Sequence, residues 1–251
     1  MSDIETPRVA IILAAGVGRR LTGWHGPKVL LQIDGMTLLE RHISCLIQNN
    51  IDQIFITVGH CSEEIQAEID RISPSCNMQL LYNPDFSRGS MVSLWRQQQN
   101  LVAGSSVLLM DGDVLYGPQM ISRLVNAKSE NVLLVDRNLE PGDEPVKICF
   151  REGTIVDFRK IPTHPFEWFG ESVGFFRFSA DMSRNLADRV AAHIRQGNQG
   201  YEYEEAIRDL ILEYPSRFGA EDISDLPWTE IDFDADVEHA RAVVLPLLNG
   251  Q

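Results

Sequence analysis

The chain has 251 residues, 44% of them hydrophobic, which is enough for the core of one α/β domain. Its 36 acidic residues outnumber 22 basic ones and give a formal net charge of -14, which argues against general binding to nucleic acid or anionic membranes. The apolar run Val9–Ala15 is too short for a membrane span and too soon interrupted for a signal peptide. We therefore expect a cytoplasmic monomer or homodimer without nucleic-acid or membrane partners.

Strands alternate with helices through the first half of the chain. Short apolar runs predict buried strands, and capping residues before periodic apolar segments predict helices. In order, we expect strand Val9–Leu13, a helix from Thr37 to Gln48, strand Ile54–Val58, a helix capped by Ser62, strand Met78–Tyr82, helix Ser90–Gln99, strand Val107–Met110, helix Pro118–Ala127 and strand Asn131–Val135. This alternation predicts a Rossmann-like, doubly wound, mostly parallel sheet.

The pattern changes after about residue 140. We expect strands at Val146–Phe150, Thr154–Phe158 and Ser172–Phe178, followed by helices at Ala180–Ile194, Glu204–Leu212 and Ala235–Leu248. No Pro/Gly/Ser-rich linker divides the chain, so the sequence predicts one domain over residues 1–251. Its second half adds antiparallel strands and helices to the sheet.

The loop after the first strand carries the most specific motif, which runs from Leu13 to Leu21 and is followed by Pro27-Lys28. The glycines let backbone N–H groups approach phosphate closely. Arg20 can form two hydrogen bonds to phosphate oxygens, and Lys28 supplies a mobile positive charge. The spacing matches neither the P-loop nor the dinucleotide fingerprint. An ordinary strand-to-helix turn explains the glycines alone, but not the glycines together with the basic residues.

This combined motif, L-A-A-G-x-G-x-R-L followed by P-K, resembles the signature of sugar-1-phosphate and phospho-alcohol nucleotidyltransferases. The resemblance extends over most of the chain and implies the nucleotide-diphospho-sugar transferase fold. It implies that residues 1–140 bind the nucleotide and residues 141–251 the acceptor. It also makes Arg20 and Lys28 catalytic, with Arg20 on the leaving pyrophosphate. The NTP would contact Leu13, Ala14, Ala15, Gly16 and Gly18.

Acidic residues at two places suggest a metal site. Asp111-Gly112-Asp113 follows a buried strand, where paired carboxylates suit Mg²⁺ and where an aspartate turn is equally common. By the resemblance, Asp113 is the main Mg²⁺ ligand and Asp111 lies close by, near the nucleotide. The later Glu230-Ile231-Asp232 resembles the phospho-alcohol branch, in which the final aspartate closes the metal site. Glu230 is a weaker candidate, and Asp234 fits a helix N-cap.

The segment Asn83–Leu94 lies where the family binds its nucleobase. The resemblance suggests that Asn83 contacts a base edge, that Gly89 lets the base lie against backbone, and that Ser90 or Ser93 donates a hydrogen bond. Its ending, S-x-x-S-L, is more similar to phosphocholine and inositol-phosphate cytidylyltransferases than to uridylyl- and thymidylyltransferases. A plain loop with a helix cap remains the alternative.

The acceptor pocket is expected in the second half. Lys147 and Lys160 resemble the layout of inositol-phosphate cytidylyltransferases, and surface lysines on an edge hairpin are the alternative. Glu171 stands where the acceptor should bind. Aromatic rings attract a quaternary ammonium, although such rings often belong to a core. The candidates for this lining are Trp168, Phe169, Tyr201 and Tyr203.

These features together predict a Mg²⁺-dependent cytidylyltransferase that couples CTP to a phosphocholine-like or polyol phosphate and releases pyrophosphate. A phosphomonoester is already ionised at neutral pH, so it attacks without a general base. The alternatives are a sugar-1-phosphate uridylyl-, thymidylyl- or guanylyltransferase, a D-x-D glycosyltransferase using an NDP-sugar, and a nucleotide sensor without turnover. The glycosyltransferase would not need Arg20 and Lys28, and the sensor would not need Asp232.

Overall fold

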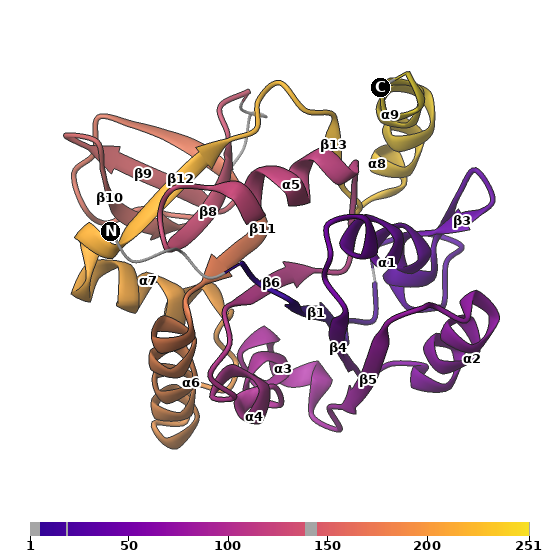
Figure 1. The fold of residues 1–251 in the computed structure, drawn as a ribbon, viewed down its shortest axis with the longest axis horizontal. Coiled ribbons are helices and arrows are strands. Elements are labelled where there is room, and N and C mark those ends of the chain that lie inside the picture. Colours follow the sequence, from indigo (N-terminus) through magenta and orange to yellow (C-terminus); the bar gives the residue numbers. More distant parts are fainter. Residues whose placement is uncertain (1–5, 19, 139–144, 251) are drawn as a thin grey trace.

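The computed structural model describes residues 6–18, 20–138 and 145–250. Its main sheet runs in the order β10-β9-β11-β6-β1-β4-β5, and β8 joins β11 to β12 (Figure 1). Its strands are β1 (Val9–Ala14), β4 (Gln53–Val58), β5 (Asn77–Tyr82), β6 (Val107–Asp111), β8 (Asn131–Asp136), β9 (Lys147–Arg151), β10 (Thr154–Arg159), β11 (Trp168–Phe178) and β12 (Phe218–Asp222). β1 lies parallel to β4 and β6, and Leu13 pairs with both Thr57 and Asp111. The carboxyl ends of these strands therefore meet at one edge.

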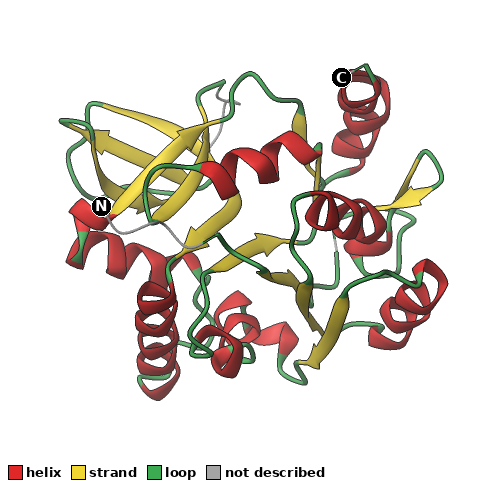
Figure 2. Cartoon of the chain, in the orientation of Figure 1, coloured by secondary structure: helices red, strands yellow, loops and turns green. Residues whose placement is uncertain are grey.

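Helices cover both faces of this sheet (Figure 2). They are α1 (Leu38–Gln48), α2 (Ser62–Ile72), α3 (Ser90–Trp95), α4 (Gln98–Leu101), α5 (Pro118–Asn126), α6 (Ala180–Arg195), α7 (Glu204–Glu213), α8 (Asp234–His239) and α9 (Leu245–Asn249), with single turns at Lys28–Leu30, Phe86–Arg88 and Pro215–Arg217 and a π-helical stretch at Ala240–Val244. Successive β1 side chains point to opposite faces. Ala10 and Ile12 pack with residues of α1, α2 and α5, whereas Val9 and Ile11 pack with residues of α3, α6 and α7.

The second half adds antiparallel pairing, as the sequence predicts. β11 pairs antiparallel with β6, β8 and β9, and β9 forms a hairpin with β10. Two small ladders lie outside the main sheet, β2 (Gln32–Ile33) with β3 (Met36–Thr37) and β7 (Val114–Tyr116) with β13 (Trp228–Glu230). In the second ladder Glu230 pairs with Val114, directly after Asp113. This pairing brings the Glu230–Asp232 segment to the end of β6.

Several local predictions need correction. Cys61, in the left-handed region, precedes α2, so Ser62 begins the helix and does not cap it. Asp234 is likewise the first residue of α8, and its carboxylate accepts a hydrogen bond from the Thr22 N–H at 3.1 Å. Asp236 caps instead, accepting from the N–H of Phe233 at 2.7 Å. The predicted helices over 90–99 and 235–248 are interrupted by a turn and by the π-helical stretch.

The predicted cap of the α1 helix is confirmed, because the Thr37 hydroxyl accepts a hydrogen bond from the Glu40 N–H at 3.0 Å. The prediction of a largely parallel α/β sheet with added antiparallel strands is also confirmed. Among the described residues, no helix combines the length and apolar character needed to cross a bilayer.

Candidate active site

A cavity of about 680 Å³ opens where β1 and β6 end and the second half of the chain crosses over them. The carboxyl ends of parallel strands are where ligands bind in such sheets. Most of the residues singled out in the sequence line it, namely Leu13, Ala14, Ala15, Gly16, Gly18, Arg20, Lys28, Gly89, Ser90, Asp111, Asp113, Lys160, Glu171, Tyr203 and Asp232.

The glycine loop closes against Lys28. Gly18 has a φ of +64°, and a Cβ added there would lie 2.9 Å from Lys28 Cγ. Glycine thus permits both the left-handed turn and the close approach of the lysine stem. The loop continues into a turn in which the Leu21 N–H donates to the Gly18 carbonyl at 3.2 Å. The stem of Lys28 is therefore held against the glycine loop at the wall of the cavity.

The charged centre joins segments more than 200 residues apart. Lys28 Nζ lies 3.0 Å from Asp113 Oδ2 and also contacts Asp232, while Arg20 Nη1 lies 2.7 Å from Asp232 Oδ2. Burial by itself would lower the pKa of Lys28, but the charges and hydrogen bonds of Asp113 and Asp232 raise it well above its usual value. Lys28 is therefore a fixed cation in this site.

Three carboxylates form the candidate cation site. Oxygens of Asp113, Glu230 and Asp232 lie within 4.8 Å of one another. Glu230 is exposed at its surface, but desolvation by the surrounding protein atoms, followed by the charges of Asp113 and Asp232, raises its pKa to about 8. A crowded set of carboxylate oxygens at the mouth of a phosphate loop fits Mg²⁺, which prefers oxygen ligands and substrate phosphates. Glu230, the weaker sequence candidate, lies with the two aspartates.

A buried histidine supports the Asp111–Asp113 turn. His42 of α1 is fully buried, and its Nε2 lies 3.1 Å from the Gly112 carbonyl oxygen. A carbonyl only accepts, so Nε2 carries the proton and Nδ1 accepts from the Tyr116 hydroxyl at 3.1 Å. Burial lowers the pKa of His42 to about 4, which keeps the ring neutral. Sequence reasoning missed His42, whose signal is a histidine on the apolar face of α1.

Asp111 is enclosed by the second half of the chain. The Tyr203 hydroxyl donates to Asp111 Oδ2 at 2.8 Å. Gly174 has a φ of +75°, and a Cβ there would lie 2.1 Å from the same oxygen, so no larger residue fits. Burial raises the pKa of Asp111 well above its usual value, and the charge of Glu204 adds to this effect.

The expected base loop is only partly in the cavity. Gly89 has a φ of +145°, and a Cβ there would meet the Gln199 carbonyl oxygen at 2.7 Å. Ser90 Oγ donates to Glu202 at 2.5 Å and accepts from the Tyr203 N–H at 2.8 Å. Asn83 is a correction: it is buried outside the cavity lining, where its Nδ2 donates to Ser93 Oγ at 3.1 Å. Its Oδ1 accepts from the Asp85 N–H at 3.0 Å within the turn after β5.

The acceptor candidates separate into two groups. Lys160 and Glu171 line the cavity, whereas Trp168, Phe169, Tyr201 and Lys147 do not. Trp168 stacks on Phe150 with ring centroids 4.0 Å apart, and Tyr201 is 48% exposed beside His193. The Lys147 ammonium lies 5.8 Å from the centroid of the Phe169 ring, which is also outside the cavity lining. Lys147 Nζ instead donates to the Lys160 carbonyl at 2.9 Å.

Comparison with known proteins places this geometry in context. The family model described as a MobA-like NTP transferase domain matches residues 10–165. The chain is 26% identical over 241 residues to the bifunctional IPC transferase and DIPP synthase of Rubrobacter xylanophilus, an alignment that covers 94% of this chain and 52% of that protein. It is 26% identical over 242 residues to the CMP-5'-(3-aminopropyl)phosphonate synthase of Streptomyces rubellomurinus, covering 93% of this chain and 38% of that protein. The chain thus spans about half, or less, of these relatives' length.

The fold also matches a solved structure, that of the inositol-1-phosphate CTP transferase from T. maritima. The TM-score is 0.76 at 19% sequence identity, and the match covers 97% of this chain and 96% of that one. At this identity the match shows a shared fold.

Proposed function

The chain belongs to the family of MobA-like NTP transferase domains, and from this premise we propose that it is a Mg²⁺-dependent cytidylyltransferase. In this proposal, CTP and a small phosphorylated alcohol combine in the cavity, a CMP-linked product forms, and pyrophosphate leaves. The observation that carries the proposal is the meeting of Arg20 and Lys28 with Asp113 and Asp232 in one cavity.

The proposed roles follow from charge. The backbone of the Leu13–Gly18 loop takes the NTP phosphates, and Arg20 and Lys28 offset negative charge as the α-phosphorus accepts the incoming oxygen and pyrophosphate departs. The acceptor phosphate is ionised at neutral pH, so no residue has to remove its proton. Positioning of the two substrates for in-line attack is then the main task of the protein. These cations explain how a chain of net charge -14 binds two polyanions.

The oxygen cluster of Asp113, Glu230 and Asp232 is the proposed holder of Mg²⁺. When bound, the ion supplies positive charge to the phosphate oxygens of both substrates. Its ligands come from two segments, which β13 and β7 bring together. His42 holds the segment that carries Asp113 in place, because its ring donates a hydrogen bond to the Gly112 carbonyl.

The choice of CTP rests on relatives and on the loop after β5. One relative is named for a CMP-linked product, and the solved structure of the same fold is an inositol-1-phosphate CTP transferase. Gly89 and Ser90 lie in the cavity where the base would bind. Lys160 and Glu171 are the proposed acceptor contacts.

Pyrophosphate release tests this function. The protein is incubated with Mg²⁺ and each NTP in turn, against phosphorylated amino alcohols, polyols and sugars. The proposal expects pyrophosphate with CTP and a phospho-alcohol, and none without an acceptor. Release with UTP or dTTP and a sugar 1-phosphate would show a transferase of the sugar branch, whereas release of NDP from an NDP-sugar would show a glycosyltransferase.

A further inference from the structure

One carboxylate in the cavity lacks the hydrogen-bond donor that its burial requires. Glu204, the first residue of α7, lines the cavity, and its Oε2 is covered from solvent without a hydrogen-bond partner among the described residues. Buried polar atoms in native proteins almost always have a partner, and an unpaired buried charge is costly. A hydrogen-bond donor on the substrate would supply the partner that Glu204 Oε2 lacks.

The charges around Glu204 favour a cation as that donor. Glu202, a second cavity-lining carboxylate, adds negative charge near Glu204, and the ammonium of Lys160 opposes it. Burial raises the pKa of Glu204 to about 7, and the negative charges of Glu202 and Glu205 add to the rise while Lys160 opposes it. A neutral donor would satisfy the hydrogen bond but would not offset the negative charge of Glu202 and Glu205 beside Glu204.

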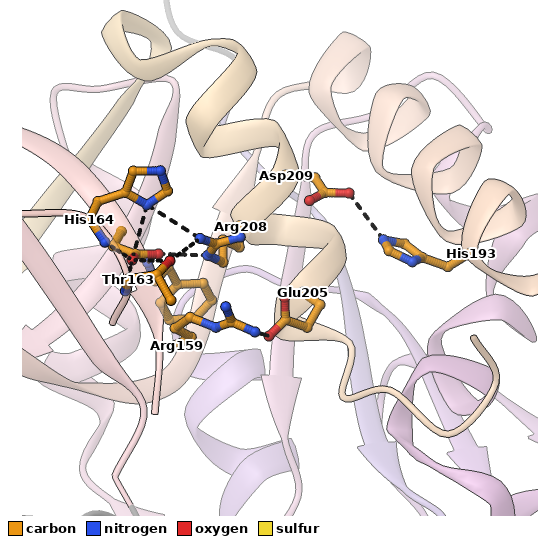
Figure 3. A network of polar contacts seen from close by, with 9 residues as sticks. Arg159, Thr163, His164, His193, Glu205, Arg208 and Asp209 are labelled. Atoms are coloured by element: carbon orange, nitrogen blue, oxygen red, sulfur yellow. Dashed lines mark hydrogen bonds and ion pairs between the residues drawn. The ribbon is translucent and has the colours of Figure 1, made fainter. Parts of the chain in front are cut away.

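Two ion pairs outside the cavity lining hold α7, the helix that begins with Glu204, and Figure 3 shows their members Arg159, Glu205 and Arg208. Its neighbour Glu205 pairs with Arg159 at 2.7 Å, next to Lys160 in the chain. One turn later, Arg208 Nε pairs with the fully buried Asp157 at 2.6 Å. These two ion pairs tie α7, which begins with Glu204, to the end of β10, which Lys160 follows.

The same geometry disfavours a quaternary ammonium. Such a group has no N–H to donate and binds through aromatic faces. Trp168, Phe169 and Tyr201 lie outside the cavity lining. Tyr203 does line it, but its hydroxyl is bound to Asp111 and its ring packs edge-on against Phe176 at 6.1 Å. Phe86, Trp228 and Phe233 also line the cavity, so a quaternary ammonium is disfavoured because it lacks an N–H bond for Glu204 Oε2.

We propose that Glu204 accepts a hydrogen bond from a protonated primary amine of the acceptor. The substrate class is then a phosphomonoester, or its phosphonate counterpart, that carries an ammonium group with N–H bonds. This inference rests on the proposed nucleotidyl transfer and adds the identity of the acceptor's second recognised group. Glu204 becomes a specificity-determining residue, and the two ion pairs hold it in position.

The test compares phosphoethanolamine with phosphocholine, which share the phosphate and the two-carbon linker and differ in N–H against N-methyl. Pyrophosphate release with CTP and Mg²⁺ is measured for the wild type, for Glu204→Gln, and for Glu221→Gln as a control that removes an equal charge on β12, outside the cavity. We expect kcat/KM to favour phosphoethanolamine by at least about tenfold, since hydrogen bonds to charged groups contribute that much. Glu204→Gln should lose most of this preference with an unchanged KM for CTP, and Glu221→Gln should keep it.

Three results would overturn the inference. Phosphocholine or inositol 1-phosphate as the preferred acceptor would do so while leaving the cytidylyltransferase proposal intact. A raised KM for CTP in Glu204→Gln would assign Glu204 to the nucleotide. If no acceptor yields pyrophosphate, the proposed function fails, and the binding of phosphoethanolamine is then measured by calorimetry. Equal affinity of the wild type and of folded Glu204→Gln for phosphoethanolamine would refute the role of Glu204 separately.

Discussion

Replacement of Lys28 by alanine should slow the chemical step more than it weakens NTP binding. Lys28 Nζ lies 3.0 Å from Asp113 Oδ2, and its side chain is only 16% exposed. At an effective dielectric constant of about 20, two unit charges at that distance interact by about 5.5 kcal/mol. An ammonium held this firmly opposes the charge that develops as pyrophosphate leaves, and it does so without reorganisation.

The expected loss in kcat is about 10²- to 10³-fold, the usual effect of removing one preorganised charge-stabilising donor. The rise in KM for CTP should stay below about tenfold, because Arg20 and the loop backbone keep their phosphate contacts. Steady-state pyrophosphate release at saturating Mg²⁺ and acceptor measures both constants. Lys128→Ala is the matched control, because Lys128 is exposed and outside the cavity lining.

The same variant should bind Mg²⁺ more tightly than the wild type, because Asp113 and Asp232 lose the cation that competes for their oxygens. Calorimetric titration with Mg²⁺ measures this effect in the absence of nucleotide. A large rise in KM with unchanged kcat would refute the reasoning, because it would make Lys28 a contact of the ground state alone.

Three further predictions follow from the site. Asp113→Asn should nearly abolish turnover in a folded protein, and chelation of Mg²⁺ should do the same to the wild type; a near-normal rate in either assay contradicts the metal site. His42→Leu should raise the Mg²⁺ concentration for half-maximal rate and lower the free energy of unfolding by about 1–3 kcal/mol, because the Gly112 carbonyl loses its donor; a lowered melting temperature with an unchanged Mg²⁺ requirement would make the role purely structural. Tyr201→Ala should leave the acceptor KM within about twofold, because this half-exposed ring lies outside the cavity lining; a large rise would return Tyr201 to the acceptor pocket.

The centre of the site was predictable because its residues lie at the carboxyl ends of parallel strands, which meet at one edge of the sheet. Leu13 and Asp111 pair near the carboxyl ends of neighbouring parallel strands, so the glycine loop and the Asp111–Asp113 turn meet at one edge of the sheet. Asp232 was placed by resemblance alone. The pairing of β13 with β7 that brings it into the site has a weak sequence signal, since each strand is only three residues long.

Side-chain direction was the part that sequence could not supply. Lys147 belongs to a predicted strand, and Trp168 begins β11 four residues before the predicted Ser172–Phe178. The face on which each side chain lies depends on register, and a shift of one residue reverses it. Asn83 illustrates a second limit, because its amide satisfies a turn where a ligand contact was expected. His42 shows the converse, a polar residue on an apolar helix face whose partner is 70 positions away.

The most direct test of the account is one competition reaction. The protein is given Mg²⁺ and equal concentrations of CTP, UTP, dTTP, GTP and ATP, together with phosphoethanolamine, phosphocholine, inositol 1-phosphate and glucose 1-phosphate, and the nucleotide products are identified by mass. The account predicts a CMP-linked phospho-alcohol as the main product, formed in equal amount with pyrophosphate and absent from the Asp113→Asn protein. A UDP-, dTDP- or GDP-sugar as the main product would contradict cytidylyl transfer.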